Sequence, residues 1–222
     1  MNASIFITAT DTNAGKTWLS KQLIQALLES GINAKALKPI ACGLNINGKN
    51  DDIETLLHAQ QLSQRSDINH YCFPLATAPS IAAQAEGKTI DPTHLQTWCS
   101  EQAENVDLCL IEGIGGLMVP ITPQYLVSDW LSDMPEIPII LVVGAKLGCI
   151  NHALLSLSLL SHMGCDPAWV VINQCTEMTD TQAIKEAIQP YLPSPSNMIE
   201  CAYQQPDSLR PLLAWLQNRL HQ

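Results

Sequence analysis

The start of the chain most strongly limits what the protein can fold into, because a short apolar run is followed by a polar turn and an amphipathic helix. Residues 4–8 (Ser-Ile-Phe-Ile-Thr) are largely apolar and β-branched, which is typical of a buried strand. The turn that follows ends in a glycine and a lysine, and Leu19, Leu23 and Leu27 then recur at helical spacing. A strand, a turn and a helix in this order predict a loop whose backbone N–H groups surround phosphate oxygens at a helix N-terminus.

Apolar strands and helices keep alternating along the rest of the chain. The runs that predict further strands are at residues 34–37, 106–111, 137–143 and 169–172. Helices are predicted from about residue 51, around 79–85, from Asp91-Pro92, after Gly144, and at about 179–188 and 208–220, and Gly31 is the expected end of the first helix. Continuous apolar strands are buried on both faces. We therefore predict an α/β fold, a mostly parallel central sheet with helices on both faces like that of P-loop NTPases, in a single domain spanning residues 1–222.

Composition and charge exclude several classes of partner. Of the 222 residues, 46% are apolar and 14% are charged, as expected for a globular protein. The formal net charge is −10, from 11 Lys and Arg against 21 Asp and Glu, and there is no basic run. We therefore expect no nucleic-acid partner and no membrane partner. No apolar run approaches the ~18–20 residues of a membrane span.

The cysteines and the N-terminus predict a cytoplasmic protein. None of the eight cysteines forms a CxxC pair, and several lie inside apolar runs, which indicates reduced structural thiols. The first residues lack the basic region and the apolar stretch of a signal peptide.

The turn at residues 10–17 (Thr-Asp-Thr-Asn-Ala-Gly-Lys-Thr) carries the strongest chemical signal. Lys16 can reach the β- and γ-phosphates of a nucleotide, and the Thr17 hydroxyl can ligate Mg²⁺. The turn departs from the GxxxxGK[ST] pattern, because Thr10 stands where the first glycine is expected. An ordinary strand-to-helix turn with an exposed lysine is the alternative.

Two carboxylates and a second lysine are candidates for the same site. Glu112 ends a buried strand, and Asp52 follows the second strand, so both could complete a magnesium site with Thr17. Asp52 could instead cap a helix or be solvated. Lys38 ends the second strand, where it could hold an anionic substrate or lie in a surface ion pair.

Other strand ends leave more than one interpretation open. Gly113, Gly115 and Gly116 would allow a close approach to a ligand or form a plain turn. Asn173 could hydrogen-bond a nucleotide base or cap a turn. We interpret His152 as an ordinary polar residue and Cys149 as a buried thiol, the alternatives being a base and a thiol of lowered pKa.

These segments together resemble the dethiobiotin synthetase family along nearly the whole chain. Residues 6–17 (FITATDTNAGKT) resemble the family's phosphate loop FVTGTDTxVGKT, and residues 38–43 (KPIACG) its KPVxSG segment. Residues 50–52 (NDD) match its N-x-D, and residues 112–116 (EGIGG) its EGAGG. Residues 142–152 (VVGAKLGCINH) match VVGxKLGCINH, which few other phosphate-loop proteins carry.

The resemblance implies a ligase that joins 7,8-diaminopelargonate and CO₂ into a cyclic urea while ATP is cleaved to ADP and phosphate, with Mg²⁺ as cofactor. An amine would capture CO₂ as a carbamate, the carbamate would attack the γ-phosphoryl group, and the second amine would close the ring. Because carbamate and triphosphate are both anions, cations must neutralise them as they meet.

The resemblance also implies roles for single residues. Thr17, Asp52 and Glu112 would hold Mg²⁺, while Lys16 and the backbone of Asn13, Ala14 and Gly15 would hold the phosphates. Thr12, Lys38 and Lys16 would act in catalysis, and Asn173 would contact adenine. The substrate would be bound by a set drawn from several loops: Thr12, Lys38, Cys42, Gly115, Leu147, Gly148 and Asn151. Family members are homodimers with the site at the subunit interface, so the last three would reach the partner's substrate.

Three features depart from the family pattern. Ala9 replaces a loop glycine, so it would be strained if that position needs a positive φ. Cys42 replaces a serine that helps to bind substrate, and a thiol is a weaker hydrogen-bond donor. The region after Asn173 matches poorly, so the adenine pocket near residues 200–204 and a carboxylate contact from Lys185 are only suggested.

Competing functions on the same fold make different demands on the sequence. A partition or septum-positioning ATPase switch carries an extra early lysine (KGGxGKT), whereas this loop has Thr10-Asp11. A cobyrinate amidotransferase would need an additional glutaminase domain, for which no length remains. A non-catalytic scaffold would not need so many polar groups at strand ends.

Overall fold

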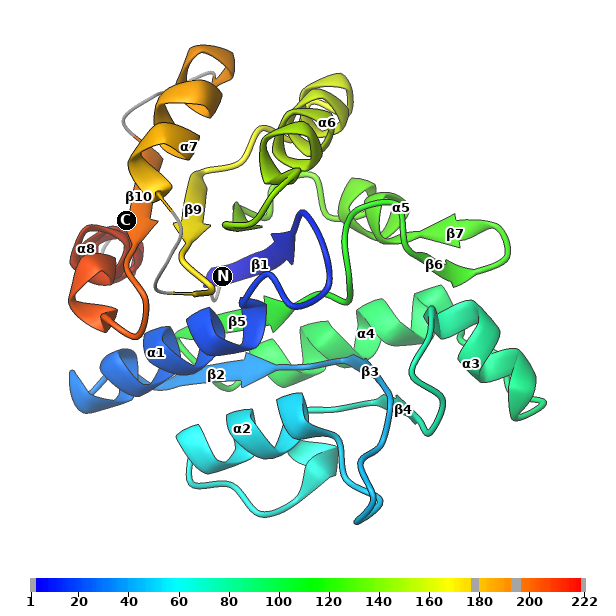
Figure 1. The fold of residues 1–222 in the computed structure, drawn as a ribbon. Helices are drawn as coiled ribbons and strands as arrows, with labels where there is room; N and C mark the ends of the chain where they lie inside the picture. The colour runs from blue at the N-terminus through cyan, green and yellow to red at the C-terminus, as the bar shows by residue number, and fades with distance from the viewer. Residues whose placement is uncertain (1–2, 177–179, 193–196, 221–222) are drawn as a thin grey trace.

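In the computed structural model, which describes residues 3–176, 180–192 and 197–220, six parallel strands form the central sheet (Figure 1). The spatial order is β10-β9-β8-β1-β5-β2, and every neighbouring pair is parallel. The bounds are β1 (Ala3–Ala9), β2 (Ala34–Leu37), β5 (Leu108–Glu112), β8 (Ile139–Gly144), β9 (Trp169–Asn173) and β10 (Met198–Cys201). The predicted parallel sheet is confirmed, and β10 is a strand that the sequence pattern did not predict.

Strand β1 lies at the centre of the sheet because its side chains are apolar on both faces. Ile5, Phe6 and Ile7 have no exposed surface. The chain leaves β1 toward β2 on one side, whereas β8, β9 and β10 lie on the other side. The strand order therefore reverses direction at β1, and in such sheets a crevice opens outside the carboxyl end of that strand.

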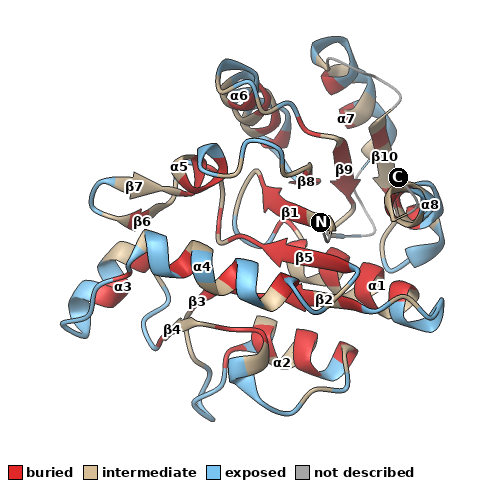
Figure 2. Cartoon of the chain, turned by 180° about the vertical axis from the view of Figure 1, so that it is seen from behind, coloured by how far each residue is buried: buried red, intermediate tan, exposed pale blue. Residues whose placement is uncertain are grey.

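Helices cover both faces of the sheet, as predicted (Figures 1 and 2). Helix α1 (Lys16–Glu29) packs on one face against β1, β5 and β2, with α2 (Asp51–Ala59) and α8 (Arg210–Arg219) beside it. The opposite face carries α4 (Pro92–Ala103), α6 (Cys149–His162) and α7 (Thr181–Ile188). The side of each helix that faces the sheet is buried, so the core lies on both sides of the strands (Figure 2).

Several predicted helix ends are confirmed by their hydrogen bonds. Gly31, just after α1, has a left-handed φ of 78°, and its neighbour Ile32 donates a backbone hydrogen bond to Leu27. Asp91 caps α4, because its carboxylate accepts hydrogen bonds from the N–H groups of Thr93 and His94. The predicted start of α7 near Thr179 lies outside the described residues.

Most of the short elements were not predicted as strands or helices. Strands β3 (Ile40–Cys42) and β4 (Tyr71–Phe73) form a separate parallel pair, and β6 (Pro120–Thr122) and β7 (Tyr125–Leu126) form an antiparallel one. These strands have only two or three residues, too few for a period-2 pattern to be recognised. Helix α3 (Pro79–Ala85) was predicted, whereas α5 (Val127–Ser132), whose Trp130 packs edge-on against Phe6, was not. Among the described helices, none has the length and hydropathy that a membrane span requires.

Removal of the α4 cap should destabilise the fold by a measurable amount. We expect Asp91→Ala to lower the free energy of unfolding by about 1 kcal/mol, because two N–H groups lose their acceptor. Asp91→Asn, the matched control, keeps an acceptor oxygen and should stay close to the parent protein. Urea denaturation measures both, and equal stability of all three proteins would contradict the assigned cap.

Candidate active site

The phosphate loop at residues 10–15 connects β1 to α1 in a conformation that only glycine accepts at its last position. Gly15 is the N-cap of α1 with a φ of 99°, and Asn13 also has a positive φ of 58°. The Asn173 amide at the end of β9 donates to the backbone oxygen of Ala14 over 2.9 Å. A Cβ atom on Gly15 would lie 2.0 Å from Asn173 Nδ2. The loop therefore packs closely against Asn173, which supports it by a hydrogen bond from the end of β9.

Lys16 is folded back beneath the phosphate loop. Its Nζ donates to the backbone oxygen of Gly115 over 2.9 Å, and only 6% of the residue is exposed. Burial and the nearby positive charge of Lys38 lower the pKa of Lys16 to about 8. The predicted alternative of an exposed lysine is therefore wrong. A buried ammonium group with only carbonyl partners is well suited to bind an anion that enters the loop.

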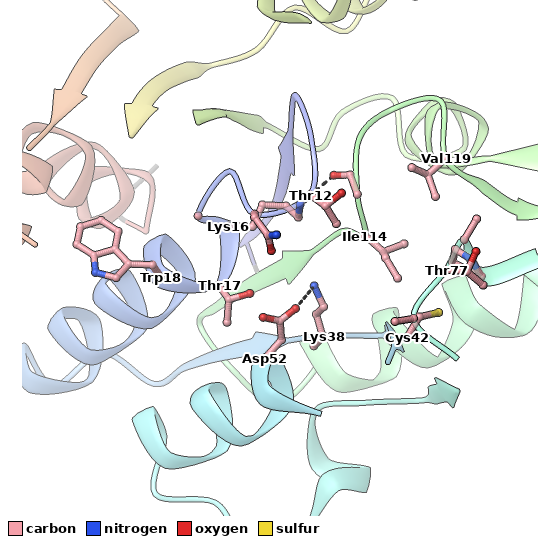
Figure 3. Close-up of a pocket in the computed structure, with 16 residues that line it drawn as sticks. Thr12, Lys16, Thr17, Trp18, Lys38, Cys42, Asp52, Thr77, Ile114 and Val119 are labelled. Carbon is pink, nitrogen blue, oxygen red and sulfur yellow. Dashed lines mark hydrogen bonds and ion pairs between the residues drawn. The ribbon is translucent and has the colours of Figure 1, made fainter. Parts of the chain in front are cut away.

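Glu112, the last residue of β5, is the centre of a cluster that includes side chains from α1, from the end of β2 and from α2. The hydroxyl of Thr17, in the first turn of α1, donates to Glu112 Oε1 over 2.7 Å. The Nζ of Lys38, just after β2, reaches the same oxygen at 2.7 Å and Asp52 Oδ2 at 3.3 Å (Figure 3). Lys38 and Glu112 are almost completely buried, so the predicted alternative of a solvated or surface-paired lysine is wrong.

Asp52 is available to this cluster because another residue caps its helix. The Asn50 side chain accepts from the N–H of Ile53 at the start of α2, so the capping alternative for Asp52 is wrong. Burial opposes the negative charge of Asp52, but Lys38 and the Thr17 hydroxyl outweigh it and lower the pKa of this carboxyl. Burial likewise opposes the charge of Lys38, but Glu112 and Asp52 raise its pKa. Lys16, Lys38, Asp52 and Glu112 thus bring two basic and two acidic side chains together, so their formal charges balance.

The oxygen atoms of this cluster could hold a divalent cation. Glu112 Oε2 is buried and has no hydrogen-bond partner in the described parts of the chain. No group of three or more His, Cys, Asp or Glu side chains among the described residues could hold a metal. The hydroxyl of Thr17 and the carboxylates of Asp52 and Glu112 would therefore need water or phosphate oxygens to complete a shell, which is the ligation that Mg²⁺ prefers.

A cavity of about 600 Å³ extends from the phosphate loop across this cluster (Figure 3). Polar groups line one part of it, and small apolar groups line the rest. The lining residues include Thr12, Asn13, Gly15, Lys16, Thr17, Lys38, Cys42, Asp52, Ala76, Ala78, Ile114, Gly115 and Val119. Burial raises the pKa of the Cys42 thiol to about 12, so it faces the cavity as a neutral group.

Leu147, Gly148 and Asn151 do not line this cavity but lie exposed around the start of α6. An ion pair of 2.6 Å between Lys146 and Asp11 holds this segment beside the phosphate loop. A second hollow of about 320 Å³ next to it shares Thr12, Gly115 and Val119 with the cavity. His152 lines that hollow, and its buried Nδ1 atom has no hydrogen-bond partner among the described residues. Cys149 is buried, as expected.

The structure gives positions for Ala9, for two of the strand-end glycines and for Lys185. Ala9 is the last residue of β1 and has no positive φ, so the expected strain is absent. Gly115 has a φ of 60°, and a Cβ on Gly116 would press on the backbone oxygens of Ala9 and Thr10. Gly116 is therefore needed for a close approach to the phosphate loop, whereas Gly115 is needed for its positive φ. Lys185 forms an ion pair with Glu200 over 3.2 Å.

Asn69 is a positioning residue that the sequence analysis missed. It is buried, and its side-chain amide donates to the backbone oxygens of Lys38 over 2.7 Å and of Tyr71 over 3.0 Å. These bonds fix the backbone from which the Lys38 side chain extends. No local pattern in the sequence marks Asn69, because its partner Lys38 lies about thirty residues earlier in the chain.

Comparison with known proteins places the chain in a family. Residues 3–195 match the family model described as an AAA domain. The chain is 38% identical over 186 residues to the ATP-dependent dethiobiotin synthetase BioD of Yersinia pestis bv. Antiqua, covering 82% of this chain and 77% of that protein. It is 34% identical over 197 residues to the BioD of Aliivibrio salmonicida, covering 86% of each chain. The chain belongs to the dethiobiotin synthetase family.

Solved structures of more distant proteins support the fold alone. The hydrogenase maturation factor HypB of Archaeoglobus fulgidus superposes with a TM-score of 0.62 at 14% identity, covering 99% of this chain and 90% of that one. A ParA family ATPase of Chlorobium tepidum has a TM-score of 0.57 at 13% identity, covering 100% of this chain and 92% of that one. These neighbours share the P-loop NTPase architecture with the dethiobiotin synthetase family and do not favour a partition switch for this member.

Two glycines at opposite ends of α1 provide a matched test of the phosphate loop. Gly15→Ala should weaken ATP binding by about tenfold or more, the factor that 1.4 kcal/mol gives, because the new Cβ collides with Asn173. Gly31→Ala has similar backbone strain, but nothing lies within 4 Å of its Cβ.

Calorimetric titration with Mg-ATP and urea denaturation separate the two effects. Gly31→Ala should lose only stability, about 1 kcal/mol, and should bind ATP normally. If the two variants bind ATP equally well, the fit between Gly15 and Asn173 has no role in binding.

Proposed function

We propose that this chain is an ATP-dependent dethiobiotin synthetase that uses Mg²⁺, acts as a homodimer and works on 7,8-diaminopelargonate and CO₂ in the cytoplasm. The observation that carries this proposal is a second buried lysine, Lys38, which lies close enough to Lys16 to lower its pKa. A phosphate loop alone needs only Lys16. The second cation is what a ligase needs if an anionic substrate is to meet the γ-phosphoryl group of ATP.

The proposed reaction has three balanced steps. One amine of 7,8-diaminopelargonate attacks CO₂ and loses a proton, which gives a carbamate. A carbamate oxygen attacks the γ-phosphorus, and the bond from that phosphorus to the β–γ bridging oxygen breaks, so that ADP leaves. The second amine attacks the carbonyl carbon of the mixed anhydride, loses a proton and expels phosphate as the ring closes. Both amines belong to one molecule, so positioning supplies much of the rate.

The residues of the site divide this work between them. The backbone N–H groups of Asn13, Ala14 and Gly15 bind the phosphates, and the ammonium group of Lys16 stabilises charge on the transferred phosphoryl group. Lys38 and the Thr12 hydroxyl orient the carbamate. Thr17, Asp52 and Glu112 would hold Mg²⁺, which when bound neutralises phosphate charge. Asn173, whose amide supports Ala14, contacts the adenine.

The rest of the cavity suits the hydrocarbon chain of the substrate. Ala76, Ala78, Ile114 and Val119 line it with apolar groups beyond Lys38. A chain of methylene groups gains free energy when it leaves water for such a surface. Gly115 and the neutral thiol of Cys42 complete the substrate wall, the latter as a weak donor.

An exposed apolar surface beside the site supports the homodimer. Met118 and Leu155 line the second hollow and are 64% and 63% exposed, and Leu147 nearby is fully exposed. Met118 and Leu155, which line one hollow, are exposed apolar side chains of the kind that gather at interaction sites. In the dimer, Leu147, Gly148 and Asn151 of one subunit would reach the substrate of the other, with Asn151 near its carboxylate.

The central sheet and the free cysteines support proposals for the domain organisation and the compartment of the protein. We propose one synthetase domain over residues 1–222, because the proposed ATP and substrate contacts lie around the ends of strands of one central sheet and on the loops and helices packed beside it. All eight cysteines are free thiols, which fits a reducing cytoplasm.

Product formation tests the proposal directly. The purified protein is mixed with Mg-ATP and bicarbonate, with and without 7,8-diaminopelargonate, and phosphate release and product mass are measured. We expect phosphate release that depends on the diamine and a product with the mass of the cyclic urea. Lys16→Ala should abolish turnover and leave the protein folded. ATP binding without diamine-dependent turnover would refute the ligase and favour an ATPase switch, and near-normal activity of Lys16→Ala would refute the loop assignment.

Asn151→Ala should raise the KM for 7,8-diaminopelargonate more than it lowers kcat, because the proposed contact lies far from the reacting amines. Steady-state kinetics at saturating ATP measure the split between the two constants. An unchanged KM would remove Asn151 from the substrate site.

Mixing two defective variants shows which subunit supplies Asn151. In a mixed dimer of Asn151→Ala with Lys16→Ala, one site has an intact phosphate loop and receives an intact Asn151 from the partner. The mixture should therefore regain a component with the parent KM. If Asn151 acts within its own subunit, no such component will be found.

A further inference from the structure

Trp18 differs from the other tryptophans because its ring packs against no other aromatic or cationic side chain within the described residues. It is half-buried in the first turn of α1. The other four indoles have ring partners within the fold: Trp98 stacks on His70 at 5.3 Å, Trp130 meets Phe6 at 5.0 Å, and Trp169 meets Trp215 at 6.2 Å. Trp18 thus leaves a flat apolar ring available at the edge of the active site.

Trp18 lines the active-site cavity together with Gly15, Lys16 and Thr17. Residues three apart on a helix share a face, so Trp18 lies one turn beyond Gly15 on the same side of α1. Asn173 is packed onto Gly15. Trp18 therefore lies on the side of the phosphate loop that faces the end of β9.

The opposite side of the loop carries the groups of the phosphoryl transfer. Figure 3 shows Trp18 on the far side of Thr17 from the Lys38–Asp52 ion pair, with Lys16 and Thr12 on the side nearer to that pair. The γ-phosphate must point toward Lys38 if it is to meet a substrate there. If the triphosphate lies along the loop in this direction, the nucleoside lies at the end of the loop away from Lys38, beside Trp18.

We propose that the indole of Trp18 stacks against the purine base of ATP and thereby sets the nucleotide preference of the enzyme. This inference rests on the proposed function, because that function determines which end of the triphosphate faces Lys38. A half-buried indole loses little side-chain freedom when it binds a base, and every base has a flat π-face on which it can stack. The larger ring system of a purine overlaps an indole more than a pyrimidine does, so ATP should bind more tightly than CTP.

The experiment compares ATP with inorganic tripolyphosphate, a probe that has the phosphates but no base. Binding of ATP, CTP and tripolyphosphate is measured by calorimetry for the parent protein, Trp18→Ala, Trp18→Phe and Trp98→Ala. Trp98 is the matched control, because it is also half-buried but stacks on His70 away from the cavity. The KM values for ATP and for 7,8-diaminopelargonate are measured for the same proteins.

Trp18→Ala should weaken ATP binding by about tenfold, within the range for loss of one stacked base, and leave tripolyphosphate binding unchanged. Its KM for ATP should rise more than its kcat falls, and its preference for ATP over CTP should shrink. Trp18→Phe should recover most of the affinity, and Trp98→Ala should bind like the parent. ATP should quench the tryptophan fluorescence of the parent more than that of Trp18→Phe.

Two results would overturn the inference. One is an ATP affinity of Trp18→Ala within twofold of the parent. The other is an equal loss of ATP and tripolyphosphate binding, which would mean that Trp18 only supports the loop. Failure of the proposed function looks different, because the parent protein would then bind ATP but form no product. In that case the comparison of ATP with tripolyphosphate still decides the role of Trp18.

Discussion

The buried ion pair between Lys38 and Glu112 is the interaction on which the rest of the site depends. It joins the ends of β2 and β5 over 2.7 Å, and Thr17 and Asp52 attach α1 and α2 to the same two groups. Removing two charges from water costs several kcal/mol for each ion, and only close, well-bonded geometry offsets that cost. The cluster therefore stabilises little by itself. Its main effect is positional, because it fixes the side chains of Thr17, Lys38 and Asp52 around Glu112.

The phosphate loop is held in place by side-chain-to-backbone hydrogen bonds that link it to strand ends on both sides of β1. Asn173 from β9 donates to Ala14, and the oxygen of Gly115 after β5 receives Lys16. The loop thus depends on the register of strands that are far apart in the sequence. This explains why Gly15 and Gly116 leave no room for a side chain, although neither is part of the hydrophobic core.

The cavity has chemically different ends, and this difference gives the bound molecules a direction. The polar end carries Lys16, Lys38 and Asp52, whereas Ile114 and Val119 are part of an apolar wall beyond Lys38. Trp18 provides a second, flat apolar surface on the other side of the loop. A charged centre between two apolar surfaces matches the proposed pair of substrates, each of which has an apolar part and a reactive polar end.

The sequence by itself determined the elements whose cause is local. The apolar run at residues 4–8, the loop up to Thr17 and the cap at Asp91 depend on neighbouring residues, and each was predicted correctly. Because Lys38 and Glu112 each end a predicted parallel strand, the sequence also predicted that they lie at the same edge of the sheet. Only the tertiary structure decided which of these groups touch, that Asn50 and not Asp52 caps α2, and that Asn69 holds the Lys38 backbone. Those contacts join residues about thirty to seventy positions apart or depend on a choice between adjacent side chains, and neither leaves a periodic signal in the chain.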